Sequence, residues 1–442
     1  MYRKSPRWTR YLINVTTLGH RCTSSITTTV LFATIGCVAA IDMRISRSSA
    51  LFAAKNESRT DASAIRSNVT TFSNDSFAKT LTRYDFPTCR APLTKRALLG
   101  DEASQDSNCA FAFLCSISVL TGSLLGVELE GIDSLPVGYV EQVQMYPLDF
   151  EEFCWANGVG ASVFDMLRGC LKDEGELPGY LYDRLLDLFH QYVVVGGMPD
   201  AVNSFLATRN VDEVRNIHRD LHALYRDDIA KYAPPELRLV IRDIYDLIPS
   251  EAGSKNKRFK LSSISGVKRF SQVTDHFLWL SEAGVALPVY NVTAPVAPLL
   301  MGEQRNLFKL FYLDTGMLMS SYSKKVAQGV FDGEAEGPFG MNMGAAFEGF
   351  VAQELKAHGF RLRYFTSKKV GELDFVEETL DGEVLAIEVK SGKSFKSHAA
   401  LDNALATKGY GIDRALVLAE CNLHRDGDVL YLPIFMTGLL EP

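Results

Sequence analysis

The sequence lacks several motifs that would assign a function directly. No G-x-x-x-x-G-K-[ST] motif occurs in its 442 residues, so no glycine-rich loop with a lysine is available to hold the phosphates of ATP. Its 8 cysteines show neither metal-ligand spacing nor a disulfide framework, which favours reduced cysteines in a cytoplasmic protein. An apolar run at 29–41 is shorter than the roughly 20 residues of a membrane-spanning helix. We therefore expect neither ATP hydrolysis nor membrane insertion.

Charge divides the chain into two parts. Residues 1–100 contain 15 Lys and Arg against 5 Asp and Glu, a net charge of +10. Residues 101–442 contain 31 against 48, a net charge of −17. An acidic body lacks the general attraction for phosphates that supplies most nonspecific affinity for nucleic acid. Residues 1–110 have no helical or strand periodicity, and we expect them to be disordered or unrelated to the rest.

The middle of the chain is predicted to be rich in helices. Within an α-helical segment at 158–260, apolar residues recur at the helical period in three stretches, which are 179–192, 211–231 and 236–248. The next segment predicts a helix at 262–270, a second helix at 271–284 and a β-ribbon at 285–313. That order is typical of a winged helix, which we place at 261–320, and such a module would bind DNA or pack against protein.

Two acidic residues are predicted to face each other across a hairpin. Residues 371–377 and 384–390 alternate as strands do, and Asp381-Gly382 between them favours a tight turn. Asp374 and Glu388 are equally far from that turn, so their Cβ atoms would lie about 5 Å apart. Like charges so placed repel each other, and a hard divalent cation such as Mg²⁺ would relieve the repulsion.

A third carboxylate is expected beside this pair. Residues 344–359 have a helical apolar period, and Glu348 borders the apolar face. A carboxylate so close to a buried face needs a partner, which a shared cation would provide. Glu348, Asp374 and Glu388 are therefore the candidate metal ligands. Lys390, on the same face as Glu388, would hold a phosphate oxygen or orient water, which makes Asp374, Glu388 and Lys390 the candidate catalytic residues.

A simpler interpretation of these acids is open at this point. Glu372, Asp374 and Glu388 would form the solvent-exposed face of an amphipathic hairpin and would need no metal. A separate motif, Leu313-Asp-Thr-Gly316, contains the D-T-G of aspartic proteases. Those enzymes use two such acids, and the chain has one D-T-G, so we reject a protease function.

The pattern D-x13-E-x-K resembles the PD-(D/E)xK nuclease superfamily, which has a restriction-endonuclease-like fold and implies Mg²⁺-dependent cleavage of nucleic acid. Over residues 119–435 the chain also resembles a prokaryotic family of AAA-type ATPases that ends in a conserved domain of unknown function with a nuclease-like fold. The motifs that carry this second resemblance are Tyr146-Pro-Leu-Asp-Phe-Glu-Glu-Phe153, Tyr192-Val-Val-Val-Gly-Gly-Met-Pro199, Tyr225-Arg-Asp-Asp-Ile-Ala-Lys-Tyr232 and Phe308-Lys-Leu-Phe-Tyr-Leu-Asp-Thr-Gly-Met317.

The resemblance stops where that family has its nucleotide site. The strand expected at 119–123 and Pro136-Val-Gly138 match the end of the ATPase domain, but Tyr139 stands where an Arg or Lys is expected. The chain thus resembles a version truncated in the ATPase domain, with a remnant at 111–157. A PD-(D/E)xK nuclease-like domain is expected at 335–435.

The expected fold class is α/β, with a helical and winged-helix middle and a C-terminal mixed sheet like that of restriction endonucleases. Three functions stay open. The C-terminal domain would be a metal-dependent nuclease, or a non-enzymatic module that binds a partner protein or DNA. The third is a nonfunctional remnant of a disrupted gene.

Overall fold

The computed structural model of the protein describes residues 29–34, 117–122, 140–254, 258–264, 266–333, 343–392 and 394–442. Of residues 1–110, for which we expected disorder, only 29–34 are described, so that prediction lies outside the described residues except for one strand. Strands β1 (Thr29–Thr34), β2 (Ile117–Gly122) and β3 (Val140–Gln144) belong to a sheet of order β2-β1-β3. The strand predicted at 119–123 is thus confirmed as β2. The fold class is confirmed as mixed α/β.

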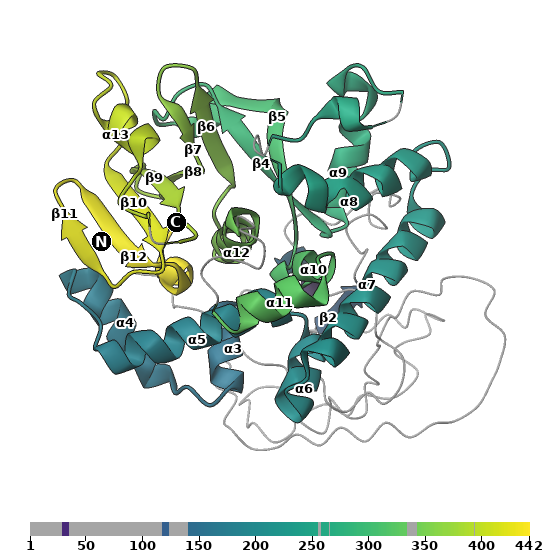
Figure 1. Cartoon of the computed structure of the whole chain (residues 1–442). Helices are drawn as coiled ribbons and strands as arrows, with labels where there is room; N and C mark the ends of the chain where they lie inside the picture. The colour runs from purple at the N-terminus through teal and green to yellow at the C-terminus, as the bar shows by residue number, and fades with distance from the viewer. Residues whose placement is uncertain are drawn as a thin grey trace, which may run out of the picture. The chain divides into compact units, whose positions relative to one another are not determined.

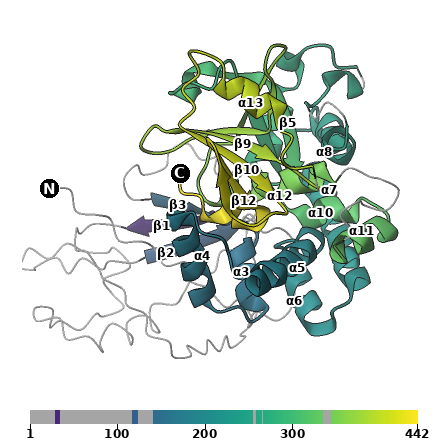
Figure 2. The same cartoon turned by 60° about the vertical axis from the view of Figure 1, so that its left-hand side comes forward.

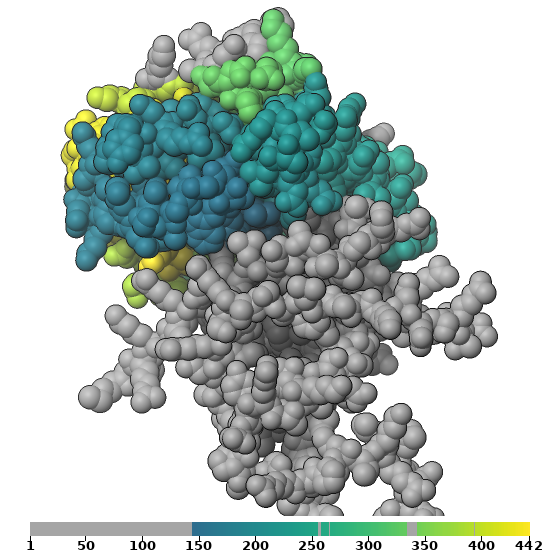
Figure 3. Space-filling view, turned by 90° about the horizontal axis from the view of Figure 1, so that it is seen from below, coloured from purple at the N-terminus to yellow at the C-terminus, as the bar shows by residue number. Residues whose placement is uncertain are grey.

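The segment that follows is helical, as predicted. Its helices are α3 (Phe150–Ala156), α4 (Ala161–Asp173), α5 (Gly179–Val195), α6 (Pro199–Thr208), α7 (Val211–Tyr232) and α8 (Arg238–Ala252). Gly196 ends α5 at a positive φ of 69°, and Pro199 begins α6 at a position where its missing N–H costs no helical hydrogen bond. Viewed from below, the blue and teal surface of these helices makes up most of the described face (Figure 3).

The winged-helix prediction is only partly matched. Residues 262–270 form no α-helix but two 3₁₀ turns, η2 (Leu261–Ser263) and η3 (Phe270–Gln272). The serines and glycine of this stretch favour turns over helix, which explains the difference. The second helix, α9 (Thr274–Glu282), and the antiparallel ribbon of β4 (Ala286–Val292) and β5 (Glu303–Tyr312) form as expected.

This ribbon is not a separate wing, because it continues into the C-terminal segment. β4 pairs in parallel with β6 (Arg363–Ser367), which pairs with β7 (Gly371–Leu373), giving a four-stranded sheet of order β5-β4-β6-β7. Strands from residues 286–312 and from residues 363–373 therefore share one mixed sheet, seen in green in Figure 1. The segments expected at 261–320 and 335–435 are joined by backbone hydrogen bonds.

A second sheet occupies the C-terminal end of the chain. It has the order β11-β12-β10-β9-β8, with parallel pairing in its centre and antiparallel strands at both edges. Its elements are β8 (Phe375–Glu378), β9 (Val384–Val389), β10 (Arg414–Ala419), β11 (His424–Asp426) and β12 (Val429–Pro433), with α13 (Ala399–Leu405) between β9 and β10 and η5 (Ile434–Leu439) at the end. Both faces of β9 are buried.

One helix links the two sheets. α12 (Gly344–Ala357) contacts β9 of the five-stranded sheet and β4 and β5 of the four-stranded sheet (Figures 1 and 2). It is buried from Gly344 to Leu355, on all sides. α10 (Thr315–Ser320) and α11 (Lys324–Phe331) connect the sheet to the helical segment by packing on α5. In the part of the chain that the structure describes, no helix is both long and apolar enough to cross a membrane.

Candidate functional site

The predicted hairpin exists, in the predicted register. β8 and β9 are antiparallel with Phe375 opposite Ile387, so the next pair outward is Asp374 and Glu388. Gly382 has a φ of 84°, as the turn requires. The strand breaks at a single residue, however. Asp374 separates β7 from β8, where the chain leaves the four-stranded sheet and enters the five-stranded one.

The acids do not form a solvent-exposed face. Glu348 is 1% exposed, and Asp374 and Glu388 are each 7% exposed. Because β9 is covered on both sides, Glu388 points into the protein rather than into water. Asp374 Oδ2 accepts a hydrogen bond from the backbone N–H of Val389 at 2.9 Å, which fixes its carboxylate beside the second strand. The interpretation of the hairpin as simply amphipathic is therefore wrong.

A lysine that the sequence analysis did not select lies among these acids. Lys309 of β5 is fully buried, and its Nζ lies 2.7 Å from Glu372 Oε1, 3.3 Å from Glu348 Oε2 and 3.6 Å from Asp374 Oδ1. The ring of Tyr364 faces the same ammonium at 5.1 Å. Helix α12, strand β7 and the residue between β7 and β8 thus bring three carboxylates to one buried cation. The signal in the sequence was a single charge within the apolar run Phe308–Leu313.

Glu388 and Lys390 form the outer part of the cluster. Lys390 Nζ lies 2.6 Å from Glu388 Oε1, whereas no described group donates a hydrogen bond to Glu388 Oε2, which is buried. Burial and, next to it, the nearby Asp374 carboxylate raise the pKa of Glu388 to about 7, while Lys390 and Lys309 oppose the shift. Lys390 is itself partly exposed, so the cluster opens to solvent on this side.

The described ion pairs of the cluster join four carboxylates to two ammonium groups. Glu348, Glu372, Asp374 and Glu388 carry four negative charges when ionised, against two positive charges on Lys309 and Lys390. Within the described ranges, no three Asp, Glu, His or Cys side chains are spaced as a ready-made metal site. The excess of two negative charges and the buried Glu388 Oε2 without a donor nevertheless suit a divalent cation. The metal-ligand roles of these residues stay a prediction.

A second polar pair lies near Lys390. His190 of α5 and Glu420, which follows β10, are joined by a 2.7 Å hydrogen bond between Nε2 and Oε1. Both line a small cavity together with Ser391. Ser391 and Glu420 follow the parallel strands β9 and β10, and ligands of such sheets bind beyond the carboxyl ends of the strands. The sequence analysis missed this pair because its members are 230 residues apart.

Three of the four motifs that carry the family resemblance meet elsewhere, at Gly197. Leu148 of the Tyr-Pro-Leu-Asp-Phe motif donates its N–H to the Gly197 carbonyl at 2.9 Å. The N–H of Gly197 in turn donates to Asp314 Oδ2 of the D-T-G motif at 2.6 Å. A Cβ at Gly197 would overlap the Leu148 backbone, so only glycine fits. Asp314 also caps α10 by accepting from Met317 N–H. This junction therefore holds elements together, and Asp314 has a structural role.

Comparison with protein families gives two matches. Residues 186–326 match the Domain of unknown function (DUF8612), and residues 343–434 match the Domain of unknown function (DUF4143). The second match covers the acids Glu348, Asp374 and Glu388 and falls where the resemblance placed a conserved C-terminal domain of unknown function. Neither match is to an ATPase model. No curated protein and no solved structure matches the chain.

Proposed function

We propose that the C-terminal segment is a metal-dependent nuclease-like domain that acts on phosphodiesters of nucleic acid. The observation that carries the proposal is the buried carboxylate cluster, in which Asp374 and Glu388 are juxtaposed by the hairpin and Glu348 is added by α12. Burying like charges is unfavourable unless a cation compensates them, and two ammonium groups compensate only half. The resemblance of D-x13-E-x-K to PD-(D/E)xK nucleases supports the same function.

Each side chain has a proposed role. Glu348, Asp374 and Glu388 would hold one or two Mg²⁺ ions, and a bound ion would supply Lewis acidity toward a phosphoryl oxygen. Lys309 holds the inner carboxylates in place, since it is buried between Glu348 and Asp374. Lys390, at the open side, would place its positive charge against a phosphate oxygen as negative charge develops in the transition state.

Calorimetric titration of the full chain with Mg²⁺ and with Mn²⁺ tests the metal site. We expect binding by the wild type and its loss in Asp374→Asn and Glu388→Gln, because each removes one charged ligand but keeps the shape. Glu383→Gln is the matched control, since Glu383 is exposed on the same hairpin. Absence of binding in the wild type would refute the metal-dependent mechanism.

Cleavage is tested separately, on single-stranded and duplex DNA and on RNA, with Mg²⁺ present. Lys390→Ala is expected to lower the cleavage rate about 10²-fold or more, as does the loss of one preorganised charge in other active sites. Lys396→Ala, an exposed lysine six residues further on, is expected to leave it unchanged.

A non-enzymatic binding module is the second candidate function. The net charge of −17 over 101–442 favours it, because an acidic surface opposes phosphate substrates. It predicts that nucleic acid or a partner protein binds without turnover and that Lys390→Ala leaves this binding intact. ATP hydrolysis is not proposed, since no phosphate-binding loop occurs in the sequence.

A further inference from the structure

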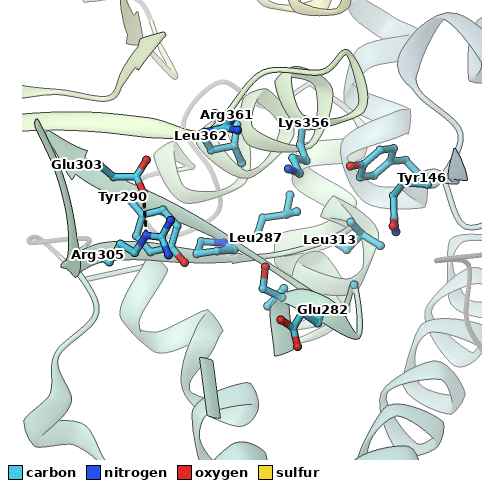
Figure 4. A pocket seen from close by; sticks show the side chains of 15 residues that line it. Tyr146, Glu282, Leu287, Tyr290, Glu303, Arg305, Leu313, Lys356, Arg361 and Leu362 are labelled. Atoms are coloured by element: carbon cyan, nitrogen blue, oxygen red, sulfur yellow. Dashed lines mark hydrogen bonds and ion pairs between the residues drawn. The ribbon is translucent and has the colours of Figure 1, made fainter. Parts of the chain in front are cut away.

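A cavity of about 590 Å³ lies apart from the carboxylate cluster, and none of the cluster residues lines it. It is built by β4, β5 and the ends of α9 and α12 (Figure 4). Its volume is within the range of small-molecule sites.

The cations of this cavity are unequally compensated. Glu303 accepts from Arg305 Nε at 3.1 Å and from the buried Arg363 Nε at 3.3 Å, so this carboxylate is already shared by two guanidinium groups. Lys356 and Arg361, by contrast, form no ion pair with any residue that the structure describes. The charge of Arg361 acts on Lys356, so the two cations are neighbours, and an anion bound beside both would make charge-assisted hydrogen bonds.

The surroundings of Lys356 support this conclusion. Lys356 is half-buried at the end of α12, and burial lowers the pKa of its ammonium group. The charge of Arg361 lowers that pKa further, whereas the buried Glu377 opposes the change. In Figure 4 Lys356 and Arg361 lie on one side of the cavity, and the carboxylate Glu282 lies on the opposite side.

Apolar and aromatic side chains share the rest of the lining with the polar residues Gln144 and Ser281. Leu287 and Leu313 lie in the middle of the cavity, and Tyr146 and Tyr290 lie toward its two ends (Figure 4). Sites for organic ligands combine apolar surface with a few polar groups that fix the orientation of the ligand. Tyrosine rings offer a flat ligand a stacking surface and a hydroxyl for hydrogen bonding.

We propose that this cavity binds a small organic phosphomonoester with a flat body, of the nucleoside monophosphate class. A phosphomonoester carries between one and two negative charges at neutral pH and offers three acceptor oxygens, which suits two adjacent cations better than a single carboxylate does. Arg361 provides a planar fork and Lys356 a point charge for these oxygens. The flat body occupies the space between the two tyrosines, over Leu287 and Leu313. This site is independent of the proposed nuclease-like function.

Calorimetry on the full chain tests the proposal with three probes: AMP, adenosine and inorganic phosphate. AMP is expected to bind more tightly than either fragment, because adenosine lacks the anion and phosphate lacks the flat body. Arg361→Ala and Lys356→Met are each expected to weaken AMP binding about ten-fold or more, the effect of losing one charge-assisted contact. The same variants should leave the weak binding of adenosine unchanged.

Two controls make the outcome decisive. Lys408→Ala removes an exposed lysine remote in sequence from the cavity and is expected to leave AMP affinity unchanged. Asp374→Asn, in the carboxylate cluster, is expected to do the same. Equal loss in Arg361→Ala and Lys408→Ala would show nonspecific attraction and overturn the proposal. The proposal would also be overturned if AMP bound no more tightly than inorganic phosphate. In that case Tyr146 and Tyr290 would contribute nothing to binding.

Discussion

Lys309 determines the electrostatics of the carboxylate cluster. Moving an ammonium group out of water costs several kcal/mol, and contacts with three carboxylates must offset that cost. The arrangement is asymmetric: the inner acids Glu348, Glu372 and Asp374 contact Lys309, whereas Glu388 contacts Lys390 at the open side. Three carboxylates thus face one ammonium group on the inner side, whereas Glu388 has a lysine of its own, so the uncompensated negative charge lies on the inner side of the cluster.

Removing this cation should destabilise the protein strongly. Lys309→Met keeps the size and apolar stem of the side chain but leaves buried carboxylates uncompensated, with an expected loss of about 3–5 kcal/mol in the free energy of unfolding. Urea unfolding at pH 7 measures it. Lys408→Met, at an exposed position, is expected to change stability by less than about 0.5 kcal/mol.

A double variant isolates the electrostatic part of this effect. Lys309→Met combined with Glu348→Gln removes one buried positive and one buried negative charge, so part of the lost stability should return. If the two changes were simply additive, the ammonium and the carboxylate would not be coupled, and the cluster as described would be incorrect.

Asp314 offers a pH-dependent test. Burial raises its pKa to about 6, although backbone N–H groups of Gly197, Met317 and Gly316 oppose the shift. A carboxyl group whose pKa is higher in the folded state binds a proton more tightly there, so its contribution to stability decreases as pH rises from about 4 to 6. Asp314→Asn lacks this titration and places an amide NH₂ against a backbone donor.

We therefore expect Asp314→Asn to be less stable than the wild type by about 1–3 kcal/mol at pH 7. The difference should grow by roughly 2–3 kcal/mol toward pH 4, where the wild type gains a proton on folding. Thermal or urea unfolding between pH 4 and 7 measures both values. A difference that stays constant with pH would contradict a raised pKa for Asp314.

At the scale of elements, features that depend on neighbouring residues could be predicted from the sequence. Features that depend on residues far apart in the chain could not. The hairpin, its Asp374–Glu388 register and the helices α5, α7, α8 and α12 follow from periodicity and turn residues within short stretches. Lys309 was missed because β5 reaches the cluster through a sheet whose strands come from distant parts of the chain. The helix expected at 262–270 does not form, because the low helix propensity of its serines and glycine outweighs the apolar spacing on which the prediction rested.

The junction of α5, α3 and α10 depends on a glycine without space for a side chain. Gly197→Ala would place a methyl group against the Leu148 backbone and disturb the hydrogen bonds of Gly197 with Leu148 and Asp314. We expect a loss of about 2 kcal/mol or more in unfolding free energy.

Gly169→Ala is the matched control: this exposed glycine in α4 has no atom near its Cβ position, so alanine should stabilise the protein by about 0.5–1 kcal/mol. Equal effects of the two substitutions would contradict the steric argument.

At the scale of the whole described segment, two sheets with different strand orders depend on each other. The chain passes from one sheet to the other at Asp374, and Lys309 of the first sheet compensates carboxylates at the entry to the second. α12 buries apolar side chains against both sheets. The boundary between the two matched families, near residue 335, therefore separates segments of sequence that share one hydrophobic core.

This interdependence predicts that the nuclease-like segment does not fold alone. A fragment of residues 335–435 would expose the β4-facing edge of β6 and would bury Glu348 and Asp374 without Lys309, at a cost of several kcal/mol. The free energy of unfolding of a folded domain is only about 5–15 kcal/mol. We expect the fragment to lack near-ultraviolet circular dichroism and a cooperative urea transition, whereas residues 144–442 unfold in one transition. A cooperatively folded 335–435 fragment would show instead that the sheet shared with β4 and β5 is dispensable, and that Lys309 is not required to keep the acids buried.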